Sequence, residues 1–305
     1  MLNIKNDDYK LLYDLEVSLK DSVEITKIKE GEKPSIMSDT MFKTMFYNDN
    51  RIKYGAKFLS YYLDITYEEL LSKIKLTKES LNKEKENSKD LKSDYVAIID
   101  DTMINIEVNN NKSKETMERN IEYANRLYQT KNKKGKKYKY MQVIQFNLNN
   151  FSFKTNDKII DIYTMQNKEG IRLHNKIIII QIYIPNLRRK WYTKGIQSLT
   201  EEERYALALI EKDIVTSKEL GGGINIMEEY MEEVEKVMDD EYFGESYDKE
   251  MALQEEYYER GKEAGEKEKS LEIAKHLLEN NIDIEIIEKS TGLNKEELIK
   301  LKDYS

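Results

Sequence analysis

Apolar residues recur at different spacings along the chain, and the spacing predicts which segments are helices and which are strands. In residues 7–20 the leucines follow the spacing of one helix face, which predicts a short amphipathic helix. Ser38 or Asp39 offers an N-cap for a second helix, and residues 51–63 predict a third. The polar stretch over 77–90 predicts a solvated loop.

Near residue 95 the spacing becomes that of β-strands. Ile104, Ile106 and Val108 alternate with polar residues, and Asp100–Asp101 interrupts the run, which predicts a β-hairpin. Helical spacing returns over 112–130. Further strands are expected over 140–151, 158–165 and 176–184. Strands and helices arranged in this way predict an α/β fold.

The C-terminal third is predicted to be helical. Thr200 and Glu203 form a capping-box pattern at the start of a helix over 200–214. Gly221–Gly223 predicts a flexible break, and the chain closes with two short helices around Gly292. We therefore expect a helical N-terminal extension, a core and an acidic helical C-terminal region, over residues 1–33, 34–220 and 224–305.

Charge is distributed unevenly between the two ends of the chain. From Glu228 onward there are 25 acidic and 11 basic residues, a net charge of −14 within a total of −8. The preceding residues therefore carry a net charge of +6. A mildly basic front tolerates a polyanion, whereas the acidic region repels one.

The residue types available restrict the metal chemistry. The chain has no Cys, and its two His residues, His174 and His276, do not suffice for a His-rich zinc site. Oxygen ligands remain, and they favour Mg²⁺, Mn²⁺ or Ca²⁺. No apolar run has the length of a membrane span, so we expect a cytoplasmic protein with no membrane partner.

The hairpin carries the strongest candidate site. Glu107 and Asn109 are two residues apart on one strand and therefore share a face. Asp94 begins the other strand, so the hairpin brings it close to both. Two neighbouring carboxylates repel, and a hard divalent cation relieves that repulsion. A polar face of this kind also suits a strand that is simply half solvated.

Three segments in this order resemble the Rpn/YhgA-like, transposase-type group of the PD-(D/E)XK nuclease superfamily. SDTMFKTMF resembles the group's D-x-x-F-K-x-x-F opening, KSDYVAIIDDTMINIEVN its K/R-x-D strand followed by I-E-x-Q, and ERNIEYANRLY its R-x-x-x-Y-x-x-x-L-Y helix. The ending T-G-L-x-x-E-E also matches the group. The resemblance implies a restriction-endonuclease-like core, in which helices flank a central mixed β-sheet, followed by the acidic helical tail.

The resemblance also implies roles for individual residues. The metal would be held by Asp94, Glu107 and the main-chain carbonyl of Val108, with Asp39 assisting through water. Substrate contacts would come from Lys43, Arg119, Tyr123 and Lys112. The superfamily's third active-site position is Lys and this group usually has Gln, but here it is Asn109. Asn is one methylene shorter than Gln, so it is open whether Asn109 reaches the attacking water. Lys112, nearby in the sequence, is a candidate to take over that role.

The function implied is a Mg²⁺- or Mn²⁺-dependent DNA endonuclease of low sequence specificity, acting in recombination, mobile elements or phage defence. The alternative is a catalytically weakened nuclease fold that binds DNA or a protein partner. Cutting both strands suits two sites, so a homodimer is left open. The acidic tail would regulate the basic front, mediate oligomerisation or form a solvated extension.

Overall fold

The computed structural model describes residues 17–20, 27–77, 95–110, 114–129, 141–154 and 156–303. The chain divides into two compact units, Met1–Tyr247 and Asp248–Ser305, here called the first and second units. The strands are β1 (Val17–Lys20), β2 (Lys75–Leu76), β3 (Tyr95–Ile99), β4 (Thr102–Asn109), β5 (Gln142–Asn149), β6 (Phe151–Phe153), β7 (Ile160–Thr164) and β8 (Ile177–Tyr183). The helices of the first unit are α1 (Asp39–Phe46), α2 (Ile52–Ser60), α3 (Tyr67–Lys73), α4 (Lys114–Gln129), α5 (Ile184–Lys194), α6 (Glu201–Ile210), α7 (Ile214–Gly221) and α8 (Asn225–Met238).

The first unit is built on a six-stranded mixed sheet with the order β2-β3-β4-β5-β8-β7. β4, β5 and β8 are parallel, whereas β3 pairs antiparallel with β4 and β7 with β8. β1 and β6 form a separate antiparallel pair. The structure thus confirms an α/β fold whose mixed sheet and flanking helices match a restriction-endonuclease-like core.

The hairpin of β3 and β4 turns where the sequence predicts it. Asp100 has a φ of +50°, a left-handed conformation that Asp tolerates better than most residues. Its carboxylate lies 3.0 Å from Lys73 Nζ, which ties the turn to α3. The register pairs Tyr95 with Ile106 and Ile99 with Thr102.

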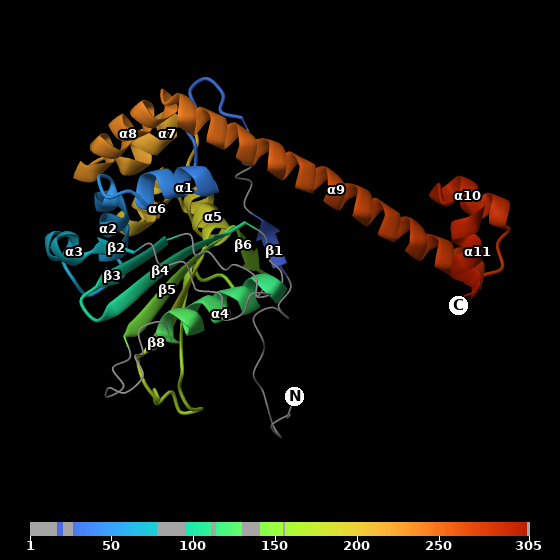
Figure 1. Ribbon diagram of the computed structural model, residues 1–305, viewed down its shortest axis with the longest axis horizontal. Helices are drawn as coiled ribbons and strands as arrows, with labels where there is room; N and C mark the ends of the chain where they lie inside the picture. The colour runs from blue at the N-terminus through green and yellow to red at the C-terminus, as the bar shows by residue number, and fades with distance from the viewer. Residues whose placement is uncertain are drawn as a thin grey trace. The chain divides into compact units, whose positions relative to one another are not determined.

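Helices cover both faces of the sheet (Figure 1). α4 packs on one face through Tyr123, Ala124 and Leu127, which contact Val96 and Val143 of the sheet within one apolar cluster. α1 and α2 pack on the other face, where Phe42 contacts Tyr95 and Phe58 contacts Phe146 at ring-centroid distances of 6.4 and 6.2 Å. Both faces of the central strands are therefore buried.

The N-terminal segment differs from the helix predicted over 7–20. Residues Val17–Lys20 form β1, which pairs with β6, and residues 7–16 lie outside the described residues. Pairing with a distant strand has outweighed the local helical spacing here. The end of the expected extension also joins the core, because Lys33 N donates to Lys212 O at 2.7 Å.

The triple glycine is a structured turn and does not separate the core from the tail. A Cβ on Gly221 would lie 2.6 Å from Met227 Cγ, and Gly223 has a φ of +79°. Arg204 Nη1 donates to Gly222 O at 2.8 Å, which fixes the turn further. α8 then packs on the core through the apolar side chains Ile226, Met227, Tyr230, Met231, Val234 and Val237. The boundary expected at 220–224 is therefore displaced, and the first unit ends at Tyr247.

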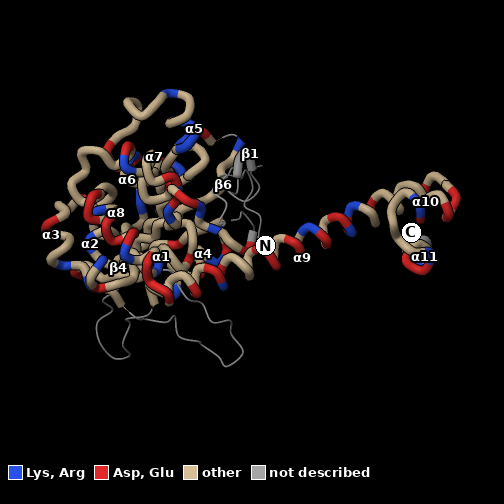
Figure 2. The backbone as a smooth tube through the Cα atoms, turned by 90° about the horizontal axis from the view of Figure 1, so that it is seen from above, with Lys and Arg blue, Asp and Glu red and all other residues tan. Residues whose placement is uncertain are grey.

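The long helix α9 (Glu241–Glu279) begins in the first unit and continues into the second. Acidic and basic residues are interspersed along it (Figure 2). None of the helices in the described ranges combines the length and the apolar character that crossing a membrane requires.

The second unit ends in two short helices, α10 (Ile284–Thr291) and α11 (Lys295–Asp303), joined at Gly292 with a φ of +72°. Asn294 Oδ1 accepts from Glu297 N at 3.0 Å, as expected of an N-cap. An apolar core joins them to the end of α9 through Ala274, Ile287, Leu293 and Leu298. Both helices and their apolar set confirm the prediction from sequence.

Candidate active site

The candidate site lies where the parallel strands β4, β5 and β8 end, on the sheet face that α4 covers. The register aligns Glu107 with Asn147 and Gln181 across the three strands. Asn109 lies beside Asn149 in the same way. The polar side chains of this face, here called the amide ladder, are Asn105, Glu107, Asn109, Gln145, Asn147, Asn149 and Gln181.

The amide ladder is buried, which corrects the expectation of an open sheet edge. Glu107 and Asn109 are each 2% exposed, and Asn105 is fully buried. The opposite residues Ile104 and Ile106 are also fully buried, as predicted. Burying a carboxylate and amides is costly unless hydrogen bonds replace the lost water, so the partners inside the ladder determine what the site can do.

Glu107 is held by its neighbour on the same strand. Asn105 Nδ2 donates to Glu107 Oε1 at 3.1 Å and to Gln145 Oε1 at 3.2 Å. The carboxylate is therefore oriented by a neutral amide donor on its own strand. A carboxylate held in this way presents negative charge to a cation in a site of low dielectric constant.

Asn109 is engaged on both sides of its amide. Its Nδ2 donates to Asn149 Oδ1 at 3.1 Å, and its Oδ1 accepts from Arg119 Nη2 at 3.3 Å. Asn149 Nδ2 in turn donates to Gln181 Oε1 at 2.7 Å. The structure thus places the Arg119 guanidinium against Asn109.

Tyr123 lies in the apolar core beneath α4. It is 5% exposed and belongs to the cluster that joins α4 to the sheet. The Arg119 guanidinium lies 5.8 Å from the Tyr123 ring centroid, a cation–π distance. Tyr123 therefore packs against the sheet and lies beside Arg119, and the substrate contact expected of it from sequence stays a prediction.

Asp39 and Lys43 lie on α1, whose first turn adjoins the end of β4. Asn110 Nδ2 donates to Met37 O at 3.2 Å and links the two elements. The N-cap of α1 is Ser38, whose side chain accepts from Met41 N at 3.1 Å, so Asp39 is not the cap. Asp39 and Lys43 are exposed and form an ion pair at 2.6 Å. Lys43 is thus paired on its own helix.

Asp94 and Lys112 lie outside the described residues. Tyr95, which follows Asp94 in the sequence, pairs with Ile106, which precedes Glu107. Within the described ranges, no group of three or more His, Cys, Asp or Glu residues could hold a metal ion. His174 accepts from Lys176 N beside the start of β8, and His276 pairs with Glu279 on α9.

The donor set fits a hard divalent cation held by oxygen atoms. Glu107 supplies a carboxylate, Val108 a main-chain carbonyl and Asn109 an amide oxygen next to it along β4. Polar atoms of Asn105, Asn120 and Asn147 are buried without a hydrogen-bond partner among the described residues, so this face retains polar capacity that those residues do not satisfy. Thiolate and imidazole ligands do not occur in the ladder.

Sequence analysis missed the members of the ladder on β5 and β8. The signal was present, because Gln145, Asn147 and Asn149 alternate with Ile144, Phe146 and Leu148. Such a strand would ordinarily turn its polar face to water. Here α4 covers that face, an arrangement that local periodicity does not reveal.

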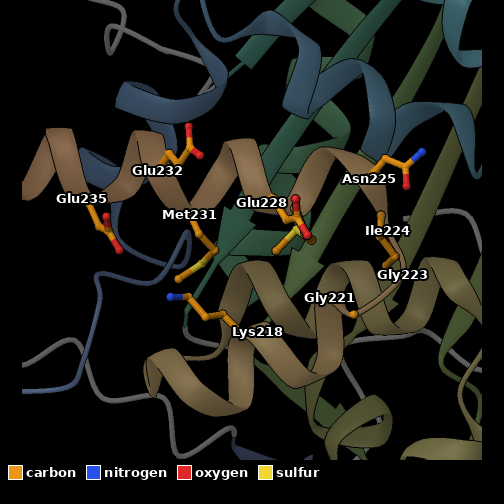
Figure 3. A pocket seen from close by; sticks show the side chains of 11 residues that line it. Lys218, Gly221, Gly223, Ile224, Asn225, Glu228, Met231, Glu232 and Glu235 are labelled. Carbon is orange, nitrogen blue, oxygen red and sulfur yellow. The ribbon is translucent and has the colours of Figure 1, made fainter.

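A groove of about 630 Å³ lies between α7 and α8 (Figure 3). Glu228, Glu232 and Glu235 of α8 line it, and Lys218 faces them from α7. It contains no residue predicted for the nuclease site.

The mixed sheet, its flanking helices and the carboxylate on the hairpin define a protein of the PD-(D/E)XK nuclease class. A family model described as "PD-(D/E)XK nuclease family transposase" matches residues 36–256, most of the chain, and the chain belongs to this family. A second model, "Rpn/YhgA-like nuclease family, C-terminal HTH domain", matches residues 267–303, which include α10 and α11. No curated protein and no solved structure matches the chain.

Proposed function

We propose that this protein is a metal-dependent DNA endonuclease whose divalent cation is held by Asp94, Glu107 and the carbonyl oxygen of Val108. The observation that carries the proposal is the Glu107 carboxylate, buried at the end of β4 and held by an amide donor. The pairing of Tyr95 with Ile106 supports Asp94 as its partner. A Mg²⁺ or Mn²⁺ ion bound there would lower the pKa of a water molecule and polarise a phosphate oxygen.

The Arg119 guanidinium supplies positive charge where the superfamily has its lysine. Asn109 occupies that position, and Arg119 Nη2 lies 3.3 Å from its amide oxygen. A guanidinium beside the reacting phosphate stabilises the negative charge that develops during hydrolysis. In this proposal Asn109 holds Arg119 and also adjoins the attacking water.

Asp39 and Lys43 form the outer part of the proposed site. The hydrogen bond between Asn110 and Met37 keeps the first turn of α1 beside the end of β4. Asp39 would assist the metal through water, while Lys43, released from its ion pair, would contact the DNA backbone. Lys112 is proposed as a further backbone contact.

The helix-turn-helix segment provides the second contact with DNA. Residues 267–303 contain nine acidic and seven basic residues, so this segment is nearly neutral and the negative charge of the tail lies largely before it. Lys295 and Lys300 are exposed on α11. We propose that this module brings the nuclease core to DNA, in the setting of recombination, mobile elements or phage defence.

Conversion of supercoiled plasmid to nicked and linear forms tests the proposal. The wild-type protein should cleave the plasmid with Mg²⁺ or Mn²⁺, and cleavage should stop when EDTA is added. The cleavage rate of both Asp94→Ala and Glu107→Ala should be lower than that of wild type by about 10²-fold or more. The matched control is Asp101→Ala, an acidic residue at the turn of the same hairpin. Activity that persists in Asp94→Ala and Glu107→Ala would refute the assignment, and DNA binding without cleavage by wild type would favour a weakened nuclease fold.

A further inference from the structure

Two fully buried amides, Asn105 and Gln145, lie next to Glu107, and the resemblance to nucleases gives neither of them a role. Gln145 Nε2 donates to the main-chain carbonyl of Asn120 in α4 at 2.9 Å. Gln145 Oε1 accepts from Asn105 Nδ2, which also donates to Glu107 Oε1. A continuous path of hydrogen bonds thus runs from the backbone of α4 to the candidate catalytic carboxylate.

The start of this path sets its direction. A main-chain carbonyl can only accept, so Gln145 must turn its NH₂ group towards Asn120. The oxygen of Gln145 must then face Asn105. Asn105 therefore presents its NH₂ group between two acceptors and donates to Glu107. The Asn120 carbonyl therefore orients Gln145, and Gln145 orients Asn105. As a result, Asn105 turns its NH₂ group, and not its oxygen, towards Glu107.

Unpaired polar atoms in and beside the path lower the stability of the fold, so stability alone does not explain why these amides are buried here. Asn105 Oδ1 and Asn147 Nδ2 are buried without a partner among the described residues, and each such atom destabilises the fold. Two apolar residues at positions 105 and 145 would remove the unpaired oxygen of Asn105, but they would also remove the donors to Glu107 Oε1 and Asn147 Oδ1. Both positions lie within strands, where β-branched or aliphatic side chains pack well.

We propose that Asn105 and Gln145 are positioning residues, which orient the Glu107 carboxylate for a divalent cation through the hydrogen-bond path from α4. This inference rests on the proposed function, because it assigns Glu107 to the cation. The path joins Gln145 to Glu107 through Asn105, and Gln145 Nε2 also donates to Asn147 Oδ1 at 3.0 Å. Groups that orient metal ligands from behind commonly change metal affinity roughly 10- to 100-fold when removed.

Isothermal titration calorimetry with Mn²⁺ alone tests the path in the full-length protein. Asn105→Leu should weaken Mn²⁺ binding about 10-fold, and Gln145→Leu should weaken it several-fold. The double variant should bind about as weakly as Asn105→Leu, because the proposed path from Gln145 to Glu107 runs through Asn105. If Asn105→Leu does not fold, Asn105→Ala carries the same prediction.

The matched control is Asn186→Leu. Asn186 is also a buried amide, 3% exposed, and its Nδ2 donates to Asn156 O and Lys158 O on the far side of β8. It should keep wild-type Mn²⁺ affinity, whatever its effect on the midpoint of thermal unfolding in EDTA. Wild-type affinity in both path variants, or multiplying effects in the double variant, would overturn the proposal. Absence of Mn²⁺ binding by wild type would instead refute the proposed function, and the path with it.

Discussion

At the residue scale, two basic side chains are held in contrasting ways. Lys33 is fully buried, its Nζ donates to Leu209 O at 3.3 Å, and it lies 5.6 Å from the Tyr230 ring centroid. Burial lowers the pKa of Lys33 to about 7, and the charge of Glu211 only partly opposes this. Arg119, by contrast, is exposed on α4, and its guanidinium is held by an amide and an aromatic ring. The first residue affects stability, and the second is a candidate functional group.

Lys33 should make stability depend on pH. Between pH 7 and 9 the unfolded chain keeps the Lys33 proton and the folded chain has released it, so the free energy of unfolding should rise with pH, by up to about 1.4 kcal/mol per unit. Below pH 7 both states are protonated and this contribution is flat. Urea unfolding of wild type and Lys33→Met should show the rise only in wild type. Parallel pH curves would show that Lys33 stays charged in the fold.

Arg119 should affect the rate of cleavage more than folding. Arg119→Gln keeps a donor for Asn109 but removes the charge, so the plasmid-cleavage rate should fall about 10²-fold while the thermal midpoint changes little. Arg119→Lys should recover part of the rate. Equal rates in wild type and Arg119→Gln would remove Arg119 from the proposed chemistry.

The types of residue in the site could be predicted from the sequence, whereas their burial and their hydrogen-bond partners could not. Glu107 and Asn109 on one strand face follow from a period of two, and the structure places them together. Their burial could not be predicted, because it depends on α4 crossing the same face. The hydrogen bond between Arg119 and Asn109 joins a helix to a strand, and neither segment's periodicity contains that information.

At the element scale, glycines within helices differ in what an added side chain would contact. Gly261 and Gly265 lie within α9, and an added Cβ would meet no atom within 4 Å at either position. A Cβ at Gly221 would instead collide with Met227. Local capping signals such as Thr200 with Glu203 were predictable because they involve residues close in the sequence. The strand β1 and the packing of α8 were not, because their partners are distant in the sequence.

The glycines therefore predict opposite effects of alanine. Gly261→Ala should stabilise α9 by about 0.8–1.0 kcal/mol, seen as slower hydrogen exchange of amides around residue 261. Gly221→Ala should destabilise the first unit by about 1–3 kcal/mol, seen as a lower thermal midpoint. Faster exchange in Gly261→Ala, or an unchanged midpoint in Gly221→Ala, would contradict this account of the two positions.

At the scale of the whole molecule, most of the negative charge of the C-terminal region lies outside the segment that matches a helix-turn-helix domain. Lys53 forms an ion pair with Glu229, and Arg51 lies 3.1 Å from Glu233, so α8 already neutralises part of the basic front. Truncation to test a regulatory tail must therefore spare α8 and begin after Tyr247. The segment matched as a helix-turn-helix domain carries little net charge.

The helix-turn-helix segment should bind phosphates of the DNA backbone. Lys295→Gln combined with Lys300→Gln should weaken DNA binding and reduce the slope of log K against log salt by about 1 for each phosphate that the variant no longer neutralises. Lys249→Gln, at a basic residue near the start of the second unit, serves as the control. An unchanged slope in the double variant would separate the segment from DNA binding.

The most direct test of the central claim is a crystal structure of the full-length protein grown with Mn²⁺, using the anomalous signal to locate the ion. We predict an anomalous peak within about 2.6 Å of carboxylate oxygens of both Asp94 and Glu107. A fully occupied peak elsewhere on the protein, with none beside Glu107, would contradict the account.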